Sequence, residues 1–348
     1  FFFKQKTAYE ILTCDWSSDV CSSDLTVLLW LCLASGTRAA ESIAQIRNLD
    51  LQLQQGAYQI TLYSVATLSN IALHGLKVAE LSGLAWDQDE GRLYALSDNG
   101  YFLELQPVFQ GQHLQEVLLH GGHRLLDEKG KALRYRRADS EGIAIENGAN
   151  GRRGDSQLLV SFEREPRLAR YRTDGTLVTY LPLPAELDDI GNYRSENKAL
   201  EAVTIHETLG ILVGPEFSLK DTPAGLLNIY SLDGGHWSVP THDEDSGALV
   251  DMAAPGDGSL IALERVYDGV FSGIQSTLHR IEFQDGGIRI AEQIYTFNPE
   301  DGLFNDDFEG LAHLAGNRYL MVSDDNNHPF KRTQLVYFEI VRQGGNTK

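Results

Sequence analysis

The chain has 348 residues, three cysteines and a formal net charge of −20 at pH 7. An acidic surplus of this size repels nucleic acid and anionic membrane surfaces, so we expect neither as a partner. The cysteines are Cys14, Cys21 and Cys32, so the chain beyond them has no disulfide framework and no thiol chemistry.

The first 40 residues do not resemble part of a folded domain. Residues 1–25 show no hydrophobic period and resemble a translated sequencing adapter, so we interpret them as an assembly artefact. Residues 26–40 begin with the apolar run TVLLWLCLA and continue with small residues, which is typical of a remnant secretory signal. The run is too short to span a bilayer. We therefore expect a secreted or periplasmic protein, a monomer without a membrane span, with one domain over residues 41–348.

Two strands are predicted next, over residues 49–53 and 58–65, where apolar and polar residues alternate around a Gln-Gln-Gly turn. The end of the chain offers only three strands of its own, at 310–314, 318–323 and 334–341. An N-terminal strand that joins them would close a ring of sheets and remove its open edges.

A repeated pattern occupies the rest of the chain: an apolar run, a turn, a second apolar run and then polar residues. The first run of each repeat opens on a small residue, at Gly83, Gly142, Ala202, Asp251 and Gly310. The spacings are 59, 60, 49 and 59 residues. Repeats of this length predict an all-β fold, a β-propeller, with five blades favoured and six possible.

Further strands and two insertions follow the repeats in chain order. The outer strands are predicted at 102–109 and 113–120, at 168–172 and 177–183, at 228–231 and 236–239, and at 277–283 and 287–297. The polar insertions 125–137 and 185–198 each precede the first strand of the next repeat. Both insertions therefore enter on the same face of the ring.

Acidic residues recur at the ends of the first two strands of the repeats, which meet at one mouth of a propeller channel. The residues before the first strands are Ser82, Glu141, Glu201, Val250 and Glu309, and those after the second strands are Asp98, Glu163, Glu216, Glu264, Asp324 and Asp325. Crowded carboxylates are normally neutralised by protonation or by a hard cation. Oxygen-only ligands favour Ca²⁺ or Mg²⁺ over zinc, and we expect Ca²⁺. The predicted metal ligands are Glu141, Glu201, Glu309, Asp98, Glu216 and Asp324.

Three cations accompany these acids: Arg164, Arg265 and Lys198. A guanidinium beside a metal-bound carboxylate is suited to hold a phosphate or carboxylate group. We therefore expect the three cations to bind a small anionic ester or phosphorylated substrate. The predicted catalytic residues are Glu141, Glu201, Glu309, Arg164 and Arg265.

The series of motifs also resembles a known family. The motifs are SGLAW with LYALSDNG, SEGIAI with LLVSFERE, LEAVTI with LVGPE, and FEGLA with YLMVSDDNN. Over roughly residues 78–340 they are similar to the bacterial phytase-like family, described as having esterase-like activity of phytase. The resemblance implies a secreted or periplasmic propeller with phosphoesterase activity. The long acid-rich calcium runs of β-propeller phytases are missing from this sequence.

Three functions are compatible with these patterns. The first is a metal-dependent phosphoesterase, which uses both the acids and the arginines. The second is a calcium-dependent lactonase or carboxyl esterase, which has no need of the arginines. In the third, a non-catalytic propeller binds a ligand at the channel mouth. The Glu residues also have a structural interpretation, as acceptors for backbone N–H groups of a neighbouring blade. Fold analogy alone does not choose among these functions.

Overall fold

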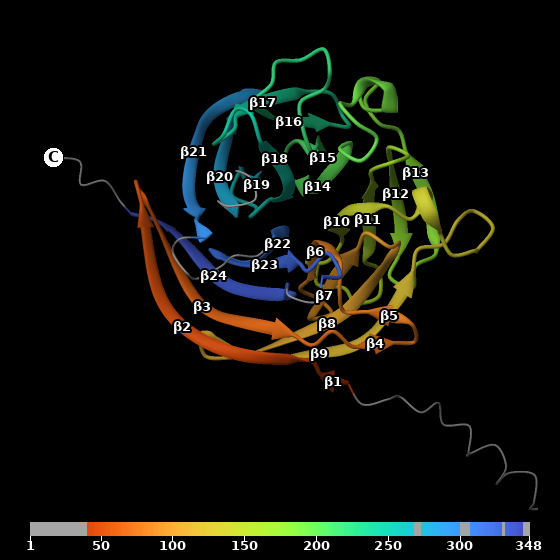
Figure 1. Ribbon diagram of the computed structural model, residues 1–348, viewed down its shortest axis with the longest axis vertical. Coiled ribbons are helices and arrows are strands. Elements are labelled where there is room, and N and C mark those ends of the chain that lie inside the picture. Colours follow the sequence, from red (N-terminus) through yellow and green to blue (C-terminus); the bar gives the residue numbers. More distant parts are fainter. Residues whose placement is uncertain (1–39, 268–272, 300–306, 329–330, 344–348) are drawn as a thin grey trace, which may run out of the picture. The chain divides into compact units, whose positions relative to one another are not determined.

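A computed structural model of the protein describes residues 40–267, 273–299, 307–328 and 331–343. These residues form five antiparallel sheets arranged as blades around a central channel (Figure 1). The five-bladed β-propeller that the repeats predict is confirmed. The predicted artefact and nearly all of the predicted signal remnant lie outside the described residues, as do Asn305 and Asp306 at the start of the fifth repeat.

Blades one to four follow the chain from the channel outward. Blade one comprises β6 (Leu81–Asp87), β7 (Arg92–Ser97), β8 (Tyr101–Gln110) and β9 (His113–Arg124), with the short β1 (Glu41–Ser42) added outside β9. Blade two comprises β10 (Ser140–Glu146), β11 (Gln157–Phe162), β12 (Arg167–Arg172) and β13 (Leu177–Leu181). Blade three comprises β14 (Leu200–His206), β15 (Gly210–Pro215), β16 (Leu226–Ser231) and β17 (His236–Pro240). Blade four comprises β18 (Gly247–Ala253), β19 (Ser259–Tyr267), β20 (Ile274–Gln284) and β21 (Gly287–Phe297).

Blade five joins the two ends of the described chain. Its inner strands are β22 (Asp307–Ala315), β23 (Arg318–Asp324) and β24 (Gln334–Arg342), and its outer strands are β3 (Tyr58–Leu68) and β2 (Ala44–Gln55). β3 pairs antiparallel with β24, so that Tyr58 lies opposite Arg342. The predicted closure by an N-terminal strand is confirmed, and the N-terminal segment supplies a second strand as well.

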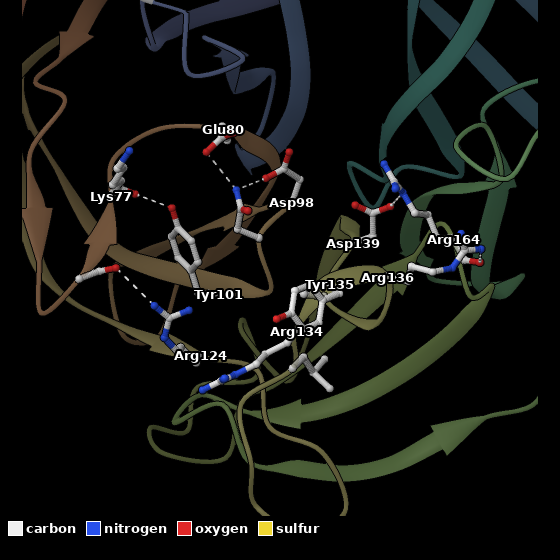
Figure 2. Close-up of a pocket in the computed structure, with 14 residues that line it drawn as sticks. Lys77, Glu80, Asp98, Tyr101, Arg124, Arg134, Tyr135, Arg136, Asp139 and Arg164 are labelled. Atoms are coloured by element: carbon white, nitrogen blue, oxygen red, sulfur yellow. Dashed lines mark hydrogen bonds and ion pairs between the residues drawn. The ribbon is translucent and has the colours of Figure 1, made fainter.

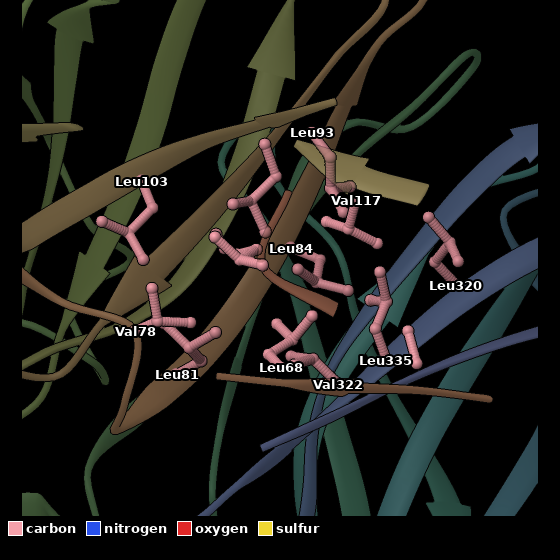
Figure 3. Close-up of a cluster of buried hydrophobic side chains, with 14 of the residues drawn as sticks. Leu68, Val78, Leu81, Leu84, Leu93, Leu103, Val117, Leu320, Val322 and Leu335 are labelled. Atoms are coloured by element: carbon pink, nitrogen blue, oxygen red, sulfur yellow. The ribbon is translucent and has the colours of Figure 1, made fainter. Parts of the chain in front are cut away.

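The hydrophobic core is divided into five clusters, one between each pair of neighbouring blades. Figure 3 shows the cluster between blades five and one, where Leu68, Leu320 and Leu335 lie with Leu81, Leu93 and Leu103. Burial of apolar side chains is the main favourable term in folding. The ring is therefore held together by the contacts between its blades.

The two insertions are anchored in these clusters. The first carries a hairpin bridge from Leu126 to Ala132 and the 3-10 helix η1 (Tyr135–Arg137), and its Leu133 is buried between blades one and two. The second carries η2 (Ile190–Asn192), and its Tyr193 is buried between blades two and three. The remaining small element is the hairpin of β4 (Ala72–Leu73) and β5 (Leu76–Lys77).

The first strand of every blade carries a β-bulge at the same position. The register slips by one residue at Ser82, Glu141, Glu201, Val250 and Glu309. The acidic positions expected just before the first strands thus lie inside them. A bulge re-aims the side chain of its extra residue and is frequent beside functional sites. The repeated motif therefore encodes a ring of bulged residues.

The glycine after the bulge in blades one, two and five is explained by close packing of neighbouring first strands. A β-carbon on Gly142 would lie 2.5 Å from the carbonyl oxygen of Glu201, and one on Gly83 would lie 2.9 Å from that of Glu141. The first strands approach too closely at these points for a side chain. The glycines thereby bring the bulged residues of adjacent blades together.

Candidate metal and anion site

Five carboxylates from blades two and three form two overlapping groups at the bulge level. The first group is Asp139, Glu141 and Glu163, and the second is Glu163, Glu201 and Glu216; within each group, one oxygen per residue lies within 4.8 Å of the others. Glu163 belongs to both groups, and all the donors are oxygen atoms. Such a donor set suits a hard cation such as Ca²⁺ or Mg²⁺.

Glu201 is the most informative member of these groups. It is only 7% exposed, and no side-chain hydrogen bond or ion pair joins its carboxylate to any residue in the described part of the chain. A buried charge without a partner is costly, and proteins avoid it by protonation or by metal binding. The position of Glu201 thus fits a ligand that satisfies it.

The pKa values of the carboxylates show the same crowding. Burial, followed by the negative charges of neighbouring glutamates, raises the pKa of Glu141 and of Glu201 well above the ordinary value. Burial and the charge of Glu216 raise the pKa of Glu163 to about 8. Without a cation, the group holds protons near neutral pH.

Arg265 fills the channel on the side of blade four, where the bulged residue is Val250. Its guanidinium pairs with Glu216 at 2.8 Å, with Asp307 at 3.3 Å and with Glu309. Its side chain is 20% exposed. Because its donors already face three carboxylates, Arg265 is committed to the acids around it. Neither Glu141 nor Glu201 forms an ion pair with an arginine in the described part of the chain.

The other predicted metal ligands lie outside the two carboxylate groups. Glu309 contacts Arg265. Asp324 accepts the backbone N–H of Asn326 at 2.8 Å, and burial raises its pKa to about 7. Asp98 lines a neighbouring pocket, where burial and the charge of Glu80 raise its pKa to about 7. The structure therefore brings together Glu141, Glu201 and Glu216 of the predicted set.

Two acidic residues of the repeats, Glu264 and Asp251, form buried contacts within the fold and do not face the channel mouth's carboxylate groups. Glu264 is fully buried and contacts the Nε2 atom of His279 at 2.5 Å and the backbone N–H of His242 at 2.9 Å. Asp251 accepts the backbone N–H of Leu311 at 2.6 Å, which joins blade four to blade five. Asp251 thus has the structural role that the sequence suggested for the glutamates Glu141, Glu201 and Glu309, although it was not among them.

A pocket of about 750 Å³ opens beside the first carboxylate group, between blades one and two. Its lining combines acidic residues with Lys77, Arg124, Arg134, Arg136 and Arg164 (Figure 2). Asp139 belongs to both the pocket and the carboxylate group. A ligand in the pocket therefore lies next to the candidate metal site.

Arg164, a predicted substrate-binding residue, lies at this junction. Its Nε atom meets Asp139 at 2.6 Å, and its side chain is 45% exposed (Figure 2). No described residue accepts a hydrogen bond from its two terminal nitrogens. Lys198 lies further along the mouth, 3.5 Å from Glu216 and over the ring of Phe217. Asp139 thus holds Arg164 through its Nε atom, and the two terminal nitrogens of Arg164 are available to a ligand.

Several residues of the site were missed from the sequence. Asp139 and Asp307 stand two positions before a bulged glutamate, in DSEG and DFEG, and this spacing is a signal that could have identified them. Arg134 and Arg136 lie in the first insertion, whose basic character is visible in the sequence. Lys77 and Arg124 have no such signal, because only the fold brings them to the pocket.

The sequence profile of the phytase-like family, described as esterase-like activity of phytase, matches residues 76–328. The chain belongs to the phytase-like family. Membership of the phytase-like family supports an esterase-like or phosphatase-like propeller in general terms, without a particular substrate. A search of curated proteins found no match to this phytase-like chain.

A comparison with solved structures found a β-propeller domain among its matches. One match is the crystal structure of the β-propeller domain of Cps50 (Swd1) from Myceliophteria thermophila, at 10% sequence identity. It covers 87% of this phytase-like chain and 98% of that chain, with a TM-score of 0.36. Within the described ranges, no helix is long and apolar enough to cross a membrane.

Proposed function

We propose that the protein is a calcium-dependent phosphomonoester hydrolase whose site is the mouth of the channel at blades two and three. The observation that carries this proposal is the pair of carboxylate groups sharing Glu163, with the buried, unpartnered Glu201 among them, beside an arginine-lined pocket. The proposal includes the secreted or periplasmic location, which rests on residues 26–40 alone.

The residues that would hold the cation are Asp139, Glu141, Glu163, Glu201 and Glu216. All of them offer oxygen donors, and Glu201 lacks any other partner in the described structure, so the set fits Ca²⁺. When bound, a divalent cation neutralises charge that develops on phosphoryl oxygens and makes a water molecule more acidic.

The protein's own groups bind and orient the phosphoryl group. The free terminal nitrogens of Arg164 form a fork that matches two non-bridging oxygens. Asp139 fixes that fork through the Nε atom of Arg164 at 2.6 Å. A phosphoryl group held in this way lies at the edge of the pocket, with its ester oxygen toward the pocket interior.

Asp98 is positioned to protonate the leaving group. It lines the pocket, and its pKa of about 7 leaves a proton on a large fraction of molecules at neutral pH. Water attacks phosphorus and the bond from phosphorus to the ester oxygen breaks. Asp98 gives its proton to the departing oxygen, the attacking water releases a proton to solvent, and Asp98 is protonated again from solvent. The products are an alcohol and inorganic phosphate.

The decisive experiment compares two substrates, 4-nitrophenyl phosphate and 4-nitrophenyl acetate, each with chelator and with added Ca²⁺. We expect phosphate release that is lost with chelator, restored by Ca²⁺ and reduced at least about 100-fold in Glu201→Gln. The matched control is Glu116→Gln, which changes an exposed glutamate on β9.

The other outcomes identify the competing functions. Cleavage of the acetate ester alone, unaffected by Arg164→Gln, would favour the lactonase or carboxyl esterase. If neither substrate is hydrolysed while calorimetry detects Ca²⁺ binding that Glu201→Gln abolishes, the ring is a non-catalytic binding site. If Ca²⁺ does not bind at all, the metal proposal is wrong.

A further inference from the structure

The pocket between blades one and two contains three cations without acidic partners. Within the described residues, no carboxylate forms an ion pair with Lys77, Arg124 or Arg134. By contrast, Arg136 pairs with Glu196 at 2.8 Å and Arg164 with Asp139 at 2.6 Å. Glu80 and Asp98 also line the pocket without an ion pair in the described residues. The three cations outnumber these two acids and leave a local positive charge that suits an anion, in a chain with a net charge of −20.

The cations come from three separate elements that only the fold brings together. Lys77 ends β5, Arg124 ends β9, and Arg134 lies in the first insertion, just before η1. Arg124 reaches the carbonyl of Gly75 at 3.4 Å and lies 6.0 Å from the ring of Tyr101. The Tyr101 hydroxyl donates to the carbonyl of Lys77 at 3.0 Å. These contacts join β5 to blade one along one wall of the pocket.

Tyr135 forms the opposite wall in an unusual conformation. Its φ angle is +55°, in the left-handed region, and it is 89% exposed. Such a conformation is costly for an aromatic residue and is frequent at ligand clamps. Burial of Leu133 and Ala138 on either side holds the turn in place. The exposed ring is therefore available to stack on a planar group.

We propose that this pocket binds the leaving group of the ester and selects a planar ring that carries an anionic group of its own. The second anion would lie among Lys77, Arg124 and Arg134, and the ring would lie against Tyr135. Because Asp139 borders both the pocket and the carboxylate group, the phosphoryl end reaches the cation-binding residues at the same time. This inference rests on the proposed phosphomonoesterase.

The first test compares the hydrolysis of 4-carboxyphenyl phosphate with that of phenyl phosphate by the full chain in Ca²⁺. We expect kcat/KM to be about tenfold or more higher for the carboxylated substrate, which corresponds to one charge-assisted hydrogen bond. The ratio should fall toward one in Arg134→Gln and Lys77→Gln and should be partly retained in Arg134→Lys. Equal kcat/KM values in the wild-type protein would overturn the inference.

The matched control is Arg152→Gln. Arg152 is an exposed arginine in the loop between β10 and β11, at the other end of blade two, and has no ion pair within the described ranges. This substitution changes the net charge by the same amount as Arg134→Gln. A ratio that falls equally in both variants would show that net charge, rather than the pocket, sets the preference.

A binding experiment separates this inference from the proposed hydrolysis. Calorimetry in Ca²⁺ compares 4-phosphonobenzoate with phenylphosphonate, neither of which has an ester bond to cleave. Tighter binding of 4-phosphonobenzoate that is lost in Arg134→Gln and weakened in Tyr135→Ala supports the pocket even if no ester is hydrolysed. Equal binding of the two phosphonates overturns the pocket assignment even if phosphatase activity is present.

Discussion

The hydroxyl of Ser161 joins two bulges across the boundary between blades two and three. It donates to the backbone carbonyl of Glu201 at 2.5 Å and accepts the backbone N–H of Gly142 at 2.9 Å. A related pair of contacts joins blade one to blade two, where Ser82 donates to the carbonyl of Ser140 at 2.9 Å and Ser140 donates to that of Ser97 at 2.7 Å. Buried serines therefore fix the backbone that carries the candidate ligands.

Ser161→Ala should destabilise the protein and weaken Ca²⁺ binding together. The substitution leaves a buried N–H and a buried carbonyl without their partner, at a cost of about 1–3 kcal/mol each. Urea denaturation in chelator measures the loss, and calorimetry measures the change in Ca²⁺ affinity. Ser69→Ala, at an exposed serine, is the control. A normal Ca²⁺ affinity in a destabilised Ser161→Ala protein would contradict a link between this serine and the ligands.

Gly142→Ala should disturb the site through the backbone. The added β-carbon would lie 2.5 Å from the carbonyl of Glu201 and 2.7 Å from the Ser161 hydroxyl, and overpacking of this kind costs about 1–3 kcal/mol. We expect a lower denaturation midpoint and weaker Ca²⁺ binding. Gly121→Ala, where a β-carbon meets nothing within 4 Å, should leave Ca²⁺ binding unchanged.

Arg265→Gln should be strongly destabilising at neutral pH. It leaves Glu216, Asp307 and Glu309 without the guanidinium they share, and breaking a buried ion pair on one side costs about 3–5 kcal/mol. Arg342→Gln provides a comparison, because Arg342 is 47% exposed and Glu292 is its one ion-pair partner among the described residues, so we expect about 0–1 kcal/mol. Denaturation of both variants at pH 7 measures the difference. If the two variants lost similar free energies of unfolding, the ion pairs of Arg265 would not stabilise the channel mouth.

Without Ca²⁺, stability should fall as the pH rises above about 4.5. Burial raises the pKa of Glu163 from 4.5 to about 8 and raises those of Glu141 and Glu201 as well. Between these values the folded state binds more protons than the unfolded state, so the free energy of unfolding decreases with pH. Melting temperatures from pH 5 to 8 in chelator measure this slope. Glu163→Gln should reduce the slope, and Ca²⁺ should flatten it. A stability that increases with pH over this range would contradict the raised pKa values of these glutamates.

The fold was predictable because a single motif carries its main constraints. The small residue at Gly83, Gly142 and Gly310 marks close contact between neighbouring first strands, and the two apolar runs mark the inner strands of each blade. Closure of blade five was also predictable, since the chain ends after three strands and begins with unassigned ones. The bulges were not foreseen, because one extra residue in a strand leaves the apolar pattern intact.

The candidate site was only partly predictable. Of the six expected ligands, Glu141 lies in one carboxylate group and Glu201 and Glu216 lie in the other, and the two groups share Glu163. Glu264 shows the limit of position alone: in the pairing of β18 with β19 it corresponds to Phe162, and Arg265 takes the place of Glu163. Glu264 is therefore directed to His279 in the interior. A shift of one residue along a strand turns the side chain to the other face, and the apolar pattern of the sequence did not reveal this register.

The pairing of β3 with β24 also determines when the protein can finish folding. β3 leaves the ribosome long before its partner β24, so it waits until all the strands of blades one to four have been made. During that interval its apolar residues Ile60, Leu62 and Val65, buried in the finished ring, are open to other chains. Contacts of such large sequence separation form slowly and leave strand edges exposed. Ring closure thus protects the finished protein at the expense of a long period of risk during its synthesis.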